Sequence, residues 1–554
     1  MPIKHRAAAD LPHHLTSAAE AARASGCALT RREFLATASI YGASATTAWG
    51  MMGLAAPVMA QATPRMGGTA RVQGVLRAMK DPLAFDFNML ANFGRGWLEY
   101  LVFYNSDGTF SPMLLDSWEI SQDATRYTLR LREGVTWNNG DPFTAADVAF
   151  NIRRMCDSTI EGNSMAGRLA ALMADGQARE DAIQAVDDLT VVLVLSQPDI
   201  AVIPNLADYQ AAIVHPSFDA STMLDNPIGT GPYLPTAYEV GLRAVLERNT
   251  THTWWNEGNG AWLDRIEFID YGEDPIAWVA AAEADEIDLI YALEGDYVDV
   301  FGAFEDWRVE EVSTAATIVI RPNALAEVGG ARPYADARVR RALALAVDNQ
   351  VILDVGQSGQ GIVAENHHVA PVHPEYSPMP PISRDPAAAR ALMEEAGMAD
   401  YEHELISLDA GFMRDSADAC AAQLRDAGIP VLRTIIPSST FWNNWSGYPF
   451  STTIWNHRPL AVQTFAVAYV SGGSWNETGI ANPEMDAIVA EALTIPDVEA
   501  RRALMRRAQA IMQEEGILIQ PYWRSLYNAQ KDGLRGGEIH VSQVIDPRVL
   551  YWVA

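Results

Sequence analysis

The strongest constraint on the fold is a strand–helix–strand succession in the middle of the chain. Residues 266–269 read Ile-Glu-Phe-Ile, Asp274-Pro275 opens an Ala-rich helix that reaches about Glu286, and residues 287–290 read Ile-Asp-Leu-Ile. Short apolar strands on both sides of a helix are typical of a parallel sheet with a crossover connection. From Gly68 onward, strand-type and helix-type segments alternate with short connections and without an internal repeat. The sequence therefore predicts an α/β protein.

Local signals place several other elements. Residues 127–132 alternate polar and apolar side chains, which predicts a half-buried strand, and a partner strand is expected from Val135. Thr144 is the expected N-cap of a helix, because Asp147 follows three residues later and can complete a capping box. Residues 517–520 read Ile-Leu-Ile-Gln and predict a strand near the C-terminal end.

Composition excludes several classes of protein. The chain has 554 residues, which is too long for one ordinary domain. Its formal net charge of −30 is too negative for a nucleic-acid-binding protein. None of its three lysines follows a glycine, so a Walker A loop is absent from the sequence. The hydrolase motifs G-x-S-x-G and H-E-x-x-H are absent as well. We therefore expect neither an enzyme nor a cofactor, and a periplasmic hydrolase is the alternative with the least support.

The N-terminus carries the pattern of an export signal. Residues 30–35 read Thr-Arg-Arg-Glu-Phe-Leu, and residues 34–60 contain no Asp, Lys or Arg and no Glu. Ala60-Gln61-Ala62 fits an A-x-A cleavage site. This arrangement predicts a twin-arginine signal peptide over residues 1–62, cleavage near Ala62, and a periplasmic mature chain that uses the twin-arginine export machinery. An uncleaved membrane anchor is the alternative.

Several motifs in the mature chain resemble one family of transport proteins. They occur in the order and at the spacing of the dipeptide/oligopeptide/nickel family, family 5, of ABC-transporter solute-binding proteins, and together they span almost the whole mature chain. These motifs are Leu115–Ile120, Tyr127–Arg132, Gly134–Val148, Ile228–Tyr233, Tyr334–Leu343 and Asn482–Asp486.

The resemblance implies a periplasmic-binding-protein-like fold, with two α/β lobes joined by crossover strands and an extra subdomain on the N-terminal lobe. The expected boundaries are 63–110, 195–271 and 522–554 for lobe I, 111–194 for the appended subdomain, and 272–521 for lobe II. It further implies a monomer that captures a peptide or peptide-like solute between the lobes by hinge closure. The solute would pass to ABC permease and ATPase subunits in the inner membrane, so this chain would need no catalytic residue.

Candidate ligand contacts gather in residues 441–476, where four of the fifteen tryptophans occur together with Asn, His and Arg. Flat aromatic faces can stack on a ligand, while amide and guanidinium groups can fix its polar atoms. From this segment we predict ligand contacts by Trp442, Trp445, Trp455, Asn456, His457, Arg458, Trp475 and Asn476. Further candidates, implied by the position of the family's cleft, are Asn92, Phe93, Arg321 and Asn323.

One position departs from the peptide-binding pattern. In peptide-binding members of the family, an Asp shortly after the equivalent of Trp455 accepts the α-ammonium group of the ligand. This chain instead has Asn456-His457-Arg458-Pro459. An arginine favours a ligand anion, so a carrier of a non-peptide anionic solute is an alternative function.

A metal-chelate carrier is a further alternative, because His367, His368 and His373 stand close together in the sequence. Adjacent histidines in an irregular, proline-containing segment do not form a regular ligand pattern, and we therefore predict no metal ligand. A sensory use of the same binding site also stays open. Cys156 and Cys420 fall in different expected lobes, which favours free thiols over a disulfide.

Overall fold

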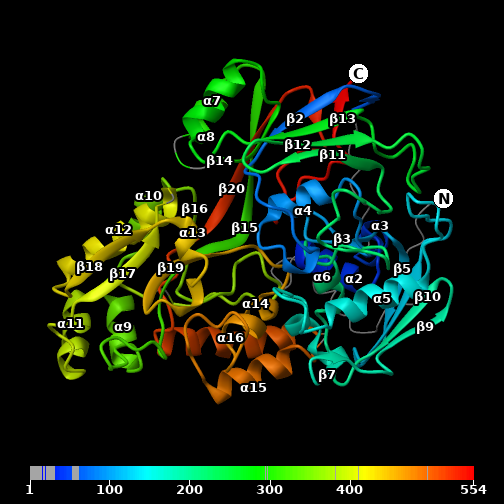
Figure 1. Cartoon of the computed structure of the whole chain (residues 1–554). Coiled ribbons are helices and arrows are strands. Elements are labelled where there is room, and N and C mark those ends of the chain that lie inside the picture. Colours follow the sequence, from blue (N-terminus) through cyan, green and yellow to red (C-terminus); the bar gives the residue numbers. More distant parts are fainter. Residues whose placement is uncertain are drawn as a thin grey trace. The chain divides into compact units, whose positions relative to one another are not determined.

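The computed structural model describes residues 31–52, 62–293, 295, 297–380, 382–409, 411–495 and 497–554, together with Leu15 and Ala19. The chain forms two compact units. Unit 1 consists of Met1–Leu293, Tyr297–Glu311 and Tyr527–Ala554, and unit 2 of Glu294–Asp296 and Val312–Leu526. Two long strands, β15 (Trp307–Pro322) and β20 (Tyr522–Lys531), begin in one unit and end in the other (Figure 1).

The main sheet of unit 1 contains the predicted strand–helix–strand succession. Its strand order is β11-β12-β13-β2-β14-β20. The first five strands are β11 (Tyr233–Glu239), β12 (Arg243–Arg248), β13 (Arg265–Ile269), β2 (Thr69–Gln73) and β14 (Leu289–Leu293). Strand β2 lies between β13 and β14 and pairs with both in parallel, which confirms the parallel unit.

The crossover helix α7 (Pro275–Glu283) begins as predicted. Asp274 Oδ1 accepts a hydrogen bond from the Ile276 amide at 3.0 Å, and proline occupies the first turn, where its missing N–H costs nothing. The helix stops three residues before the expected Glu286, because Asp285 adopts a left-handed conformation with φ of 57°. Helix α8 (Tyr297–Gly302) follows β14.

A second sheet of unit 1 falls in residues 115–194 and has the order β5-β6-β10-β9. It is antiparallel and consists of β5 (Leu115–Ile120), β6 (Arg126–Leu131), β10 (Thr190–Val194) and β9 (Ile183–Asp187). Helix α5 (Ala145–Met155) has the predicted capping box between Thr144 and Asp147. The strand expected from Val135 is wrong, since residues 136–142 form a tight turn with only a Thr136–Pro142 bridge.

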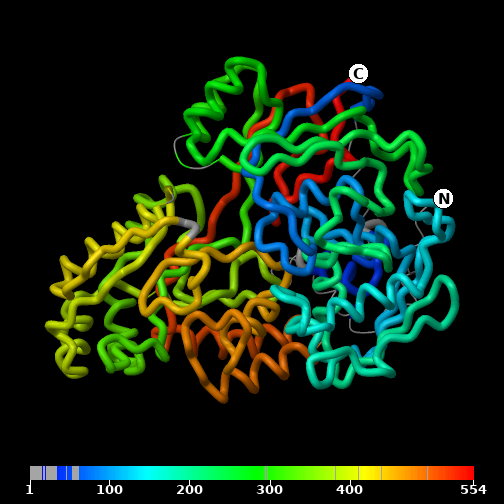
Figure 2. The backbone as a smooth tube through the Cα atoms, viewed as in Figure 1, coloured from blue at the N-terminus to red at the C-terminus, as the bar shows by residue number. Residues whose placement is uncertain are grey.

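Shorter elements complete unit 1. Residues 64–65 meet the C-terminal end of the chain in a small sheet, in which β22 pairs with both β1 and β21 (Figure 2). The remaining elements are β1 (Pro64–Arg65), β21 (Leu534–Arg535), β22 (Tyr551–Val553), β3 (Val102–Tyr104), β4 (Phe110–Pro112), β7 (Met173–Ala174), β8 (Gln177–Ala178), η2 (Pro82–Ala84), η3 (Ala166–Leu172), α4 (Asn88–Gly94) and α6 (Val202–Leu206).

The expected leader segment forms two helices, α2 (Arg31–Ile40) and α3 (Ala45–Met51). The Phe110 amide donates to Ser39 Oγ at 2.9 Å, and the Trp118 indole donates to the Ile40 carbonyl at 2.6 Å. The candidate cleavage site extends outside the described residues. Within the part of the chain that the structure describes, none of the helices combines the length and apolar character that a membrane span requires.

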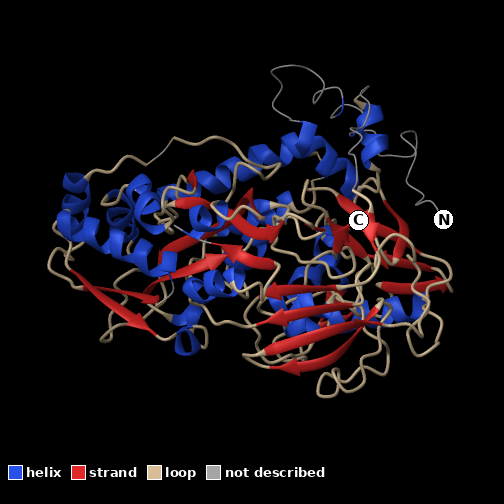
Figure 3. Ribbon diagram, turned by 90° about the horizontal axis from the view of Figure 1, so that it is seen from above, coloured by secondary structure: helices blue, strands red, loops and turns tan. Residues whose placement is uncertain are grey.

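Unit 2 is a second α/β structure, in which helices separate most of the strands along the chain. Figure 3 shows its helices in blue and its strands in red. Its strand order is β20-β15-β19-β17-β18, with β16 also paired to β20. Strands β17 and β18 run parallel and are connected by α12. These strands are β16 (Gly361–Val363), β17 (His403–Leu408), β18 (Val431–Ile436) and β19 (Phe450–Trp455). The helical elements are α9 (Ala337–Leu345), α10 (Asn349–Gly356), α11 (Pro386–Glu395), α12 (Gly411–Asp426), α13 (Ser438–Phe441), η4 (Trp445–Gly447), α14 (Ala461–Ala468), α15 (Pro483–Ala492) and α16 (Val498–Glu514).

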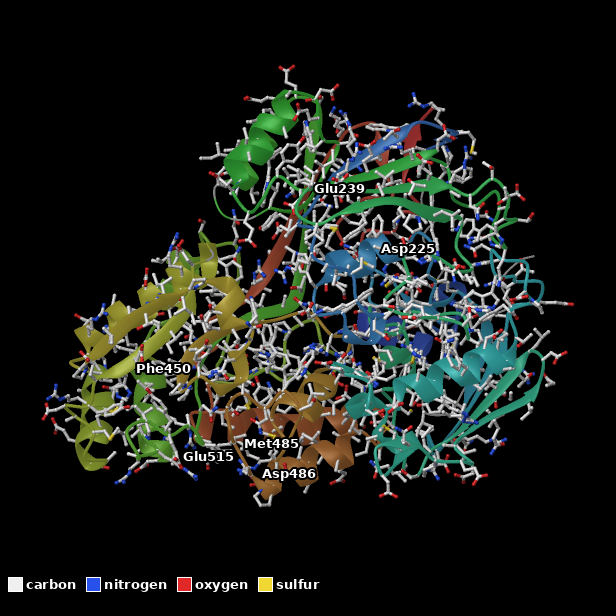
Figure 4. All side chains as sticks on the ribbon, viewed as in Figure 1. Asp225, Glu239, Phe450, Met485, Asp486 and Glu515 are labelled. Atoms are coloured by element: carbon white, nitrogen blue, oxygen red, sulfur yellow. The ribbon has the colours of Figure 1, made fainter. Side chains whose placement is uncertain are left out.

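The core of unit 2 lies between these strands and helices. Its members include Ile318, Leu405, Cys420 and Phe450, all fully buried, and Phe450 is labelled in Figure 4. The strand expected at residues 517–520 is wrong, because only Ile519 forms a bridge, to Ile320, and regular pairing begins at Tyr522.

The compact units divide the chain differently from the predicted lobes in two regions. Residues 522–526, which the sequence analysis assigned to lobe I, belong to unit 2. Residues 272–293 and 297–311 belong to unit 1, whereas the sequence analysis assigned them to lobe II. The physical reason is strand pairing: β14 pairs with β2, and the apolar side of α7 and α8 packs in a core that includes Ile290, Phe301 and Trp307.

Candidate functional site

Three of the four tryptophans predicted as ligand contacts form one cluster in unit 2. The ring centroids of Trp455 and Trp475 lie 5.7 Å apart, those of Trp445 and Trp475 6.3 Å, and those of Trp445 and Trp455 6.5 Å. All three pairs meet edge to face, as aromatic quadrupoles prefer. Trp455 is buried, while Trp445 and Trp475 are partly exposed. We call Trp445, Trp455 and Trp475 the tryptophan cluster.

Each ring of the tryptophan cluster is held by a different kind of element. Trp455 is the last residue of β19, Trp445 begins the short helix η4, and Trp475 lies in the loop after α14. That loop is fixed by Asn476, whose side-chain amide donates to the carbonyls of Val470 and Ile480 at 2.9 and 2.8 Å. Asn476 therefore orders the backbone beside Trp475.

Trp442 is not part of the tryptophan cluster, because its ring contacts a different aromatic residue. Its ring meets Phe441 edge to face at 5.2 Å, and it is packed against the core of unit 2 as a partly buried residue. The spacing of the four tryptophans in the sequence could not show which three form the cluster and which one packs against the core.

A buried carboxylate, Glu477, stands behind the tryptophan cluster, and the sequence analysis did not identify it. Its oxygens accept hydrogen bonds from the Trp455 indole at 2.7 Å, from Arg321 Nε at 2.9 Å and from Thr453 Oγ1 at 2.7 and 2.8 Å. Glu477 is 1% exposed. The only sequence signal was an acidic residue two positions after Trp475, and that is not specific.

Arg321, a predicted ligand contact, is the partner of Glu477. Its side chain is fully buried, and it also donates to the backbone carbonyls of Tyr448, at 2.8 Å, and Trp445. Asn323 donates to the Ser446 carbonyl at 3.2 Å and accepts from the Leu325 amide at 3.0 Å. Both residues therefore hold the backbone of the η4 turn, and with it Trp445.

The Arg458 side chain also lies beside the tryptophan cluster. Its guanidinium carbon lies 5.3 Å from the ring centroid of Trp475 and 5.8 Å from that of Trp455, within the range of cation–π attraction. The residue is 7% exposed. Asn456 is exposed, and His457 is buried with its Nδ1 accepting from the Ala315 amide at 3.0 Å.

Two buried histidines, His368 and His373, contact residues of this site. His368 meets the Trp455 ring at 5.4 Å and its Nδ1 is hydrogen-bonded to the Tyr469 hydroxyl at 2.7 Å, while His373 Nε2 donates to the Arg458 carbonyl at 3.0 Å. Burial lowers the pKa of His373 to about 4 and that of His368 well below its usual value. Both imidazoles are therefore neutral at pH 7.

The histidine segment offers no metal site in the described part of the chain. His367 Nε2 is paired with Glu365 at 2.8 Å, and no group of three or more His, Cys, Asp or Glu side chains is placed to hold an ion among the residues described. Glu375 is instead fully buried in an ion pair with Arg501 Nε at 3.0 Å.

The two candidates from unit 1 have packing roles. Phe93 is fully buried, and its ring meets those of Trp97, Tyr238 and Phe268 at 5.0–5.5 Å. Asn92 is 1% exposed and donates to the Gln543 carbonyl at 3.0 Å. In this arrangement both stabilise α4 against the rest of unit 1.

Comparison with known proteins identifies the relatives of this chain. Residues 109–477 match the family described as bacterial extracellular solute-binding proteins, family 5 Middle. The periplasmic oligopeptide-binding protein OppA of Haemophilus influenzae is 26% identical over 76% of this chain and 81% of its own length.

Solved structures show the same fold. The murein tripeptide binding protein MppA of Escherichia coli superposes with a TM-score of 0.77 at 22% identity, covering 89% of this chain and 99% of its own. The protein AgaA of Agrobacterium tumefaciens R10, in complex with agropinic acid, gives 0.75 at 21% identity over 88% and 99%. The predicted α/β, periplasmic-binding-protein-like fold is therefore confirmed.

Proposed function

This chain belongs to family 5 of the bacterial extracellular solute-binding proteins, and on that premise we propose that it captures a peptide or peptide-like solute outside the cytoplasm and delivers it to an ABC importer. The observation that carries the proposal is the tryptophan cluster with Arg458. Partly exposed indole faces can cover the flat groups of a solute, and a guanidinium beside them can fix one polar end.

The partners follow from the family. The permease would receive the loaded protein, and the hydrolysis of ATP would take place on the partner ATPase subunit. This chain therefore needs no residue with a catalytic role. Two of its groups with strongly shifted pKa values, His368 and Tyr469, are hydrogen-bonded to each other.

Export is the second part of the proposal. Arg31-Arg32 and the uncharged segment that follows would direct the folded precursor to the twin-arginine machinery, and cleavage near Ala62 would release the mature protein into the periplasm. Replacing Arg31 and Arg32 together by Lys is expected to leave the precursor in the cytoplasm. Cell fractionation measures this, and a mature-sized periplasmic product from that variant would contradict the export route.

Binding is tested with the mature chain, Thr63–Ala554, by isothermal titration with a defined pool of di- to pentapeptides. Trp475→Leu is expected to weaken binding at least tenfold, because it removes a stacking face of the cluster. The matched control is Trp278→Leu, at a half-buried tryptophan on α7 in unit 1. Equal loss in both variants, or no heat of binding in the native chain, would contradict the proposed function.

A carrier of a non-peptide anionic solute is the second candidate. The placement of Arg458 favours it, and the fold accepts such ligands, since AgaA was solved with agropinic acid. A released ligand that contains no peptide bond would select this candidate.

A further inference from the structure

We propose that part of the expected leader docks on the mature part of its own chain, and that it must leave this position before the export machinery can bind it. We call residues 34–52, which include most of α2 and all of α3, the docked segment. The surface that holds it lies on β4 and β5, at Phe110 and Trp118. This inference rests on the proposed export and adds a regulatory step to it.

The docked segment buries its apolar side chains within unit 1 (Figure 1). Phe34 and Ala38 lie one turn apart on the same face of α2, and both are fully buried, as is Met52 after α3. Ala36 lies beside the turn before β4, since a Cβ atom on Gly108 would be 3.9 Å from the Ala36 Cβ. Helices of 10 and 7 residues are too short to be stable in water on their own. Their stability therefore comes from packing on each other and on the rest of unit 1.

Two hydrogen bonds join the docked segment to the mature part of the chain. The Phe110 amide on β4 donates to Ser39 Oγ at 2.9 Å, and the Trp118 indole on β5 donates to the Ile40 carbonyl at 2.6 Å. Ile40 is the last residue of α2, where backbone carbonyls lack a partner within the helix. Phe110 and Trp118 are 4% and 2% exposed. Departure of the segment would take the acceptors away from two buried donors, and this loss favours the docked state.

The turn between α2 and α3 carries its own sequence signals. Gly42 adopts a φ of 84°, and the amides of Gly42 and Ala43 donate to carbonyls in the last turn of α2 at 2.9 and 3.1 Å, which is the Schellman arrangement. Ser44 then caps α3, because its Oγ accepts from the Thr47 amide at 2.9 Å. The segment is therefore specified as two helices with a defined bend, and it presents a fixed shape to β4 and β5.

The twin-arginine pattern lies on the same helix as the docked segment, since α2 begins at Arg31. A helix that is packed along one face and bonded at its C-terminal end must be released before a receptor can enclose it. The precursor therefore has a docked and a released state, and the export machinery draws on the released one. Docking covers the apolar leader in the cytoplasm and slows its capture, because the apparent affinity of the receptor falls with the released fraction.

Hydrogen exchange of the full-length precursor, followed by mass spectrometry, tests the docking. We expect the amides of residues 34–52 to exchange at least tenfold more slowly than in a synthetic peptide of the same sequence. Trp118→Phe removes the indole donor and should speed this exchange about fivefold, which corresponds to about 1 kcal/mol. The matched control is Trp278→Phe, which removes an indole bond to the Gly272 carbonyl elsewhere in unit 1 and should leave this exchange unchanged.

Slow exchange across α5 shows in each form that unit 1 is folded. A second variant, Ser39→Ala, changes only the leader and should speed exchange of the Phe110 amide, whose acceptor it removes. The inference is overturned if residues 34–52 of the native precursor exchange at the rate of the free peptide. Equal effects of the Trp118 and Trp278 variants would overturn it as well.

Pulse–chase labelling in an exporting host tests the regulatory step. The Trp118→Phe precursor should reach the periplasm at least twofold faster than the native precursor, and Trp278→Phe at the native rate. Unchanged or slower export of Trp118→Phe, when exchange shows that its leader is loosened, would overturn this step. If none of the forms yields a periplasmic product, the proposed export fails and the regulatory step with it, while hydrogen exchange still decides whether the leader docks.

Discussion

Glu477→Gln is the most informative single change for the architecture of the site. The substitution keeps the shape of the side chain but removes the charge that balances Arg321, whose side chain is 0% exposed. Leaving a buried charge without its partner costs about 3–5 kcal/mol. Arg321 keeps two carbonyl acceptors, from Trp445 and Tyr448, so we expect the lower end, about 3 kcal/mol.

For a unit of roughly 200 residues, that loss lowers the melting temperature by about 6–12 °C. Scanning calorimetry of the mature chain measures it, and the transition of unit 2 should move alone. The matched control is the double variant Arg321→Met, Glu477→Leu, which removes both charges and should recover most of the loss, because an apolar pair of similar volume replaces the ion pair. A single variant that loses less than about 1 kcal/mol, or a double variant as unstable as the single one, would refute this reasoning.

Three further predictions concern groups outside the tryptophan cluster. Glu99→Gln should lower the stability of unit 1 by about 2 kcal/mol in calorimetry, because the buried Glu99 carboxylate accepts hydrogen bonds from Thr230, two indoles and Arg548. In the variant, Arg548 still keeps its ion pair with Asp546. An unchanged transition would contradict this prediction. Cys156 and Cys420, whose pKa values burial raises to about 12, should not react with an aromatic disulfide reagent until the mature chain is unfolded in urea. Rapid labelling of the native chain would contradict that. The pKa of His403 is lowered to about 4 by burial, so below 6.5 the unfolded chain binds a proton that the folded chain does not. The free energy of unfolding should therefore fall as pH decreases from about 6.5 to 4, and His403→Gln should reduce that slope in urea titrations; an identical slope would contradict the assignment.

The fold was largely predictable because its local signals agree with the tertiary structure. The start of α7 at Asp274-Pro275 and the capping box of α5 follow from rules that involve only neighbouring residues. Where the outcome depended on long-range pairing, the prediction was less accurate. Residues 517–520 have strand-type composition, yet within this segment only Ile519 forms a bridge, to Ile320 of β15.

For the candidate site, the sequence indicated a segment of the chain but not the contacts that its side chains make. The density of aromatic residues in 441–476 led us to predict ligand contacts in this segment, and Trp445, Trp455 and Trp475 do converge in unit 2. Their contact with a ligand stays a prediction. The ion pair between Arg321 and Glu477 joins residues that are 156 positions apart in the chain, and no local sequence pattern predicts it. Phe93 illustrates the converse, because an aromatic residue predicted near a cleft by position alone packs fully in the core.

The most direct test of the central claim is native mass spectrometry of the mature chain, Thr63–Ala554, purified from the periplasm of an exporting host without a denaturing step. The account predicts a non-covalent solute, present in about one copy per chain, that is lost on denaturation and is identified as a peptide or a carboxylate-bearing compound. Metal analysis of the same sample tests the chelate alternative. A chain that appears at its polypeptide mass alone, and stays so after incubation with the peptide pool, would contradict solute capture by this protein.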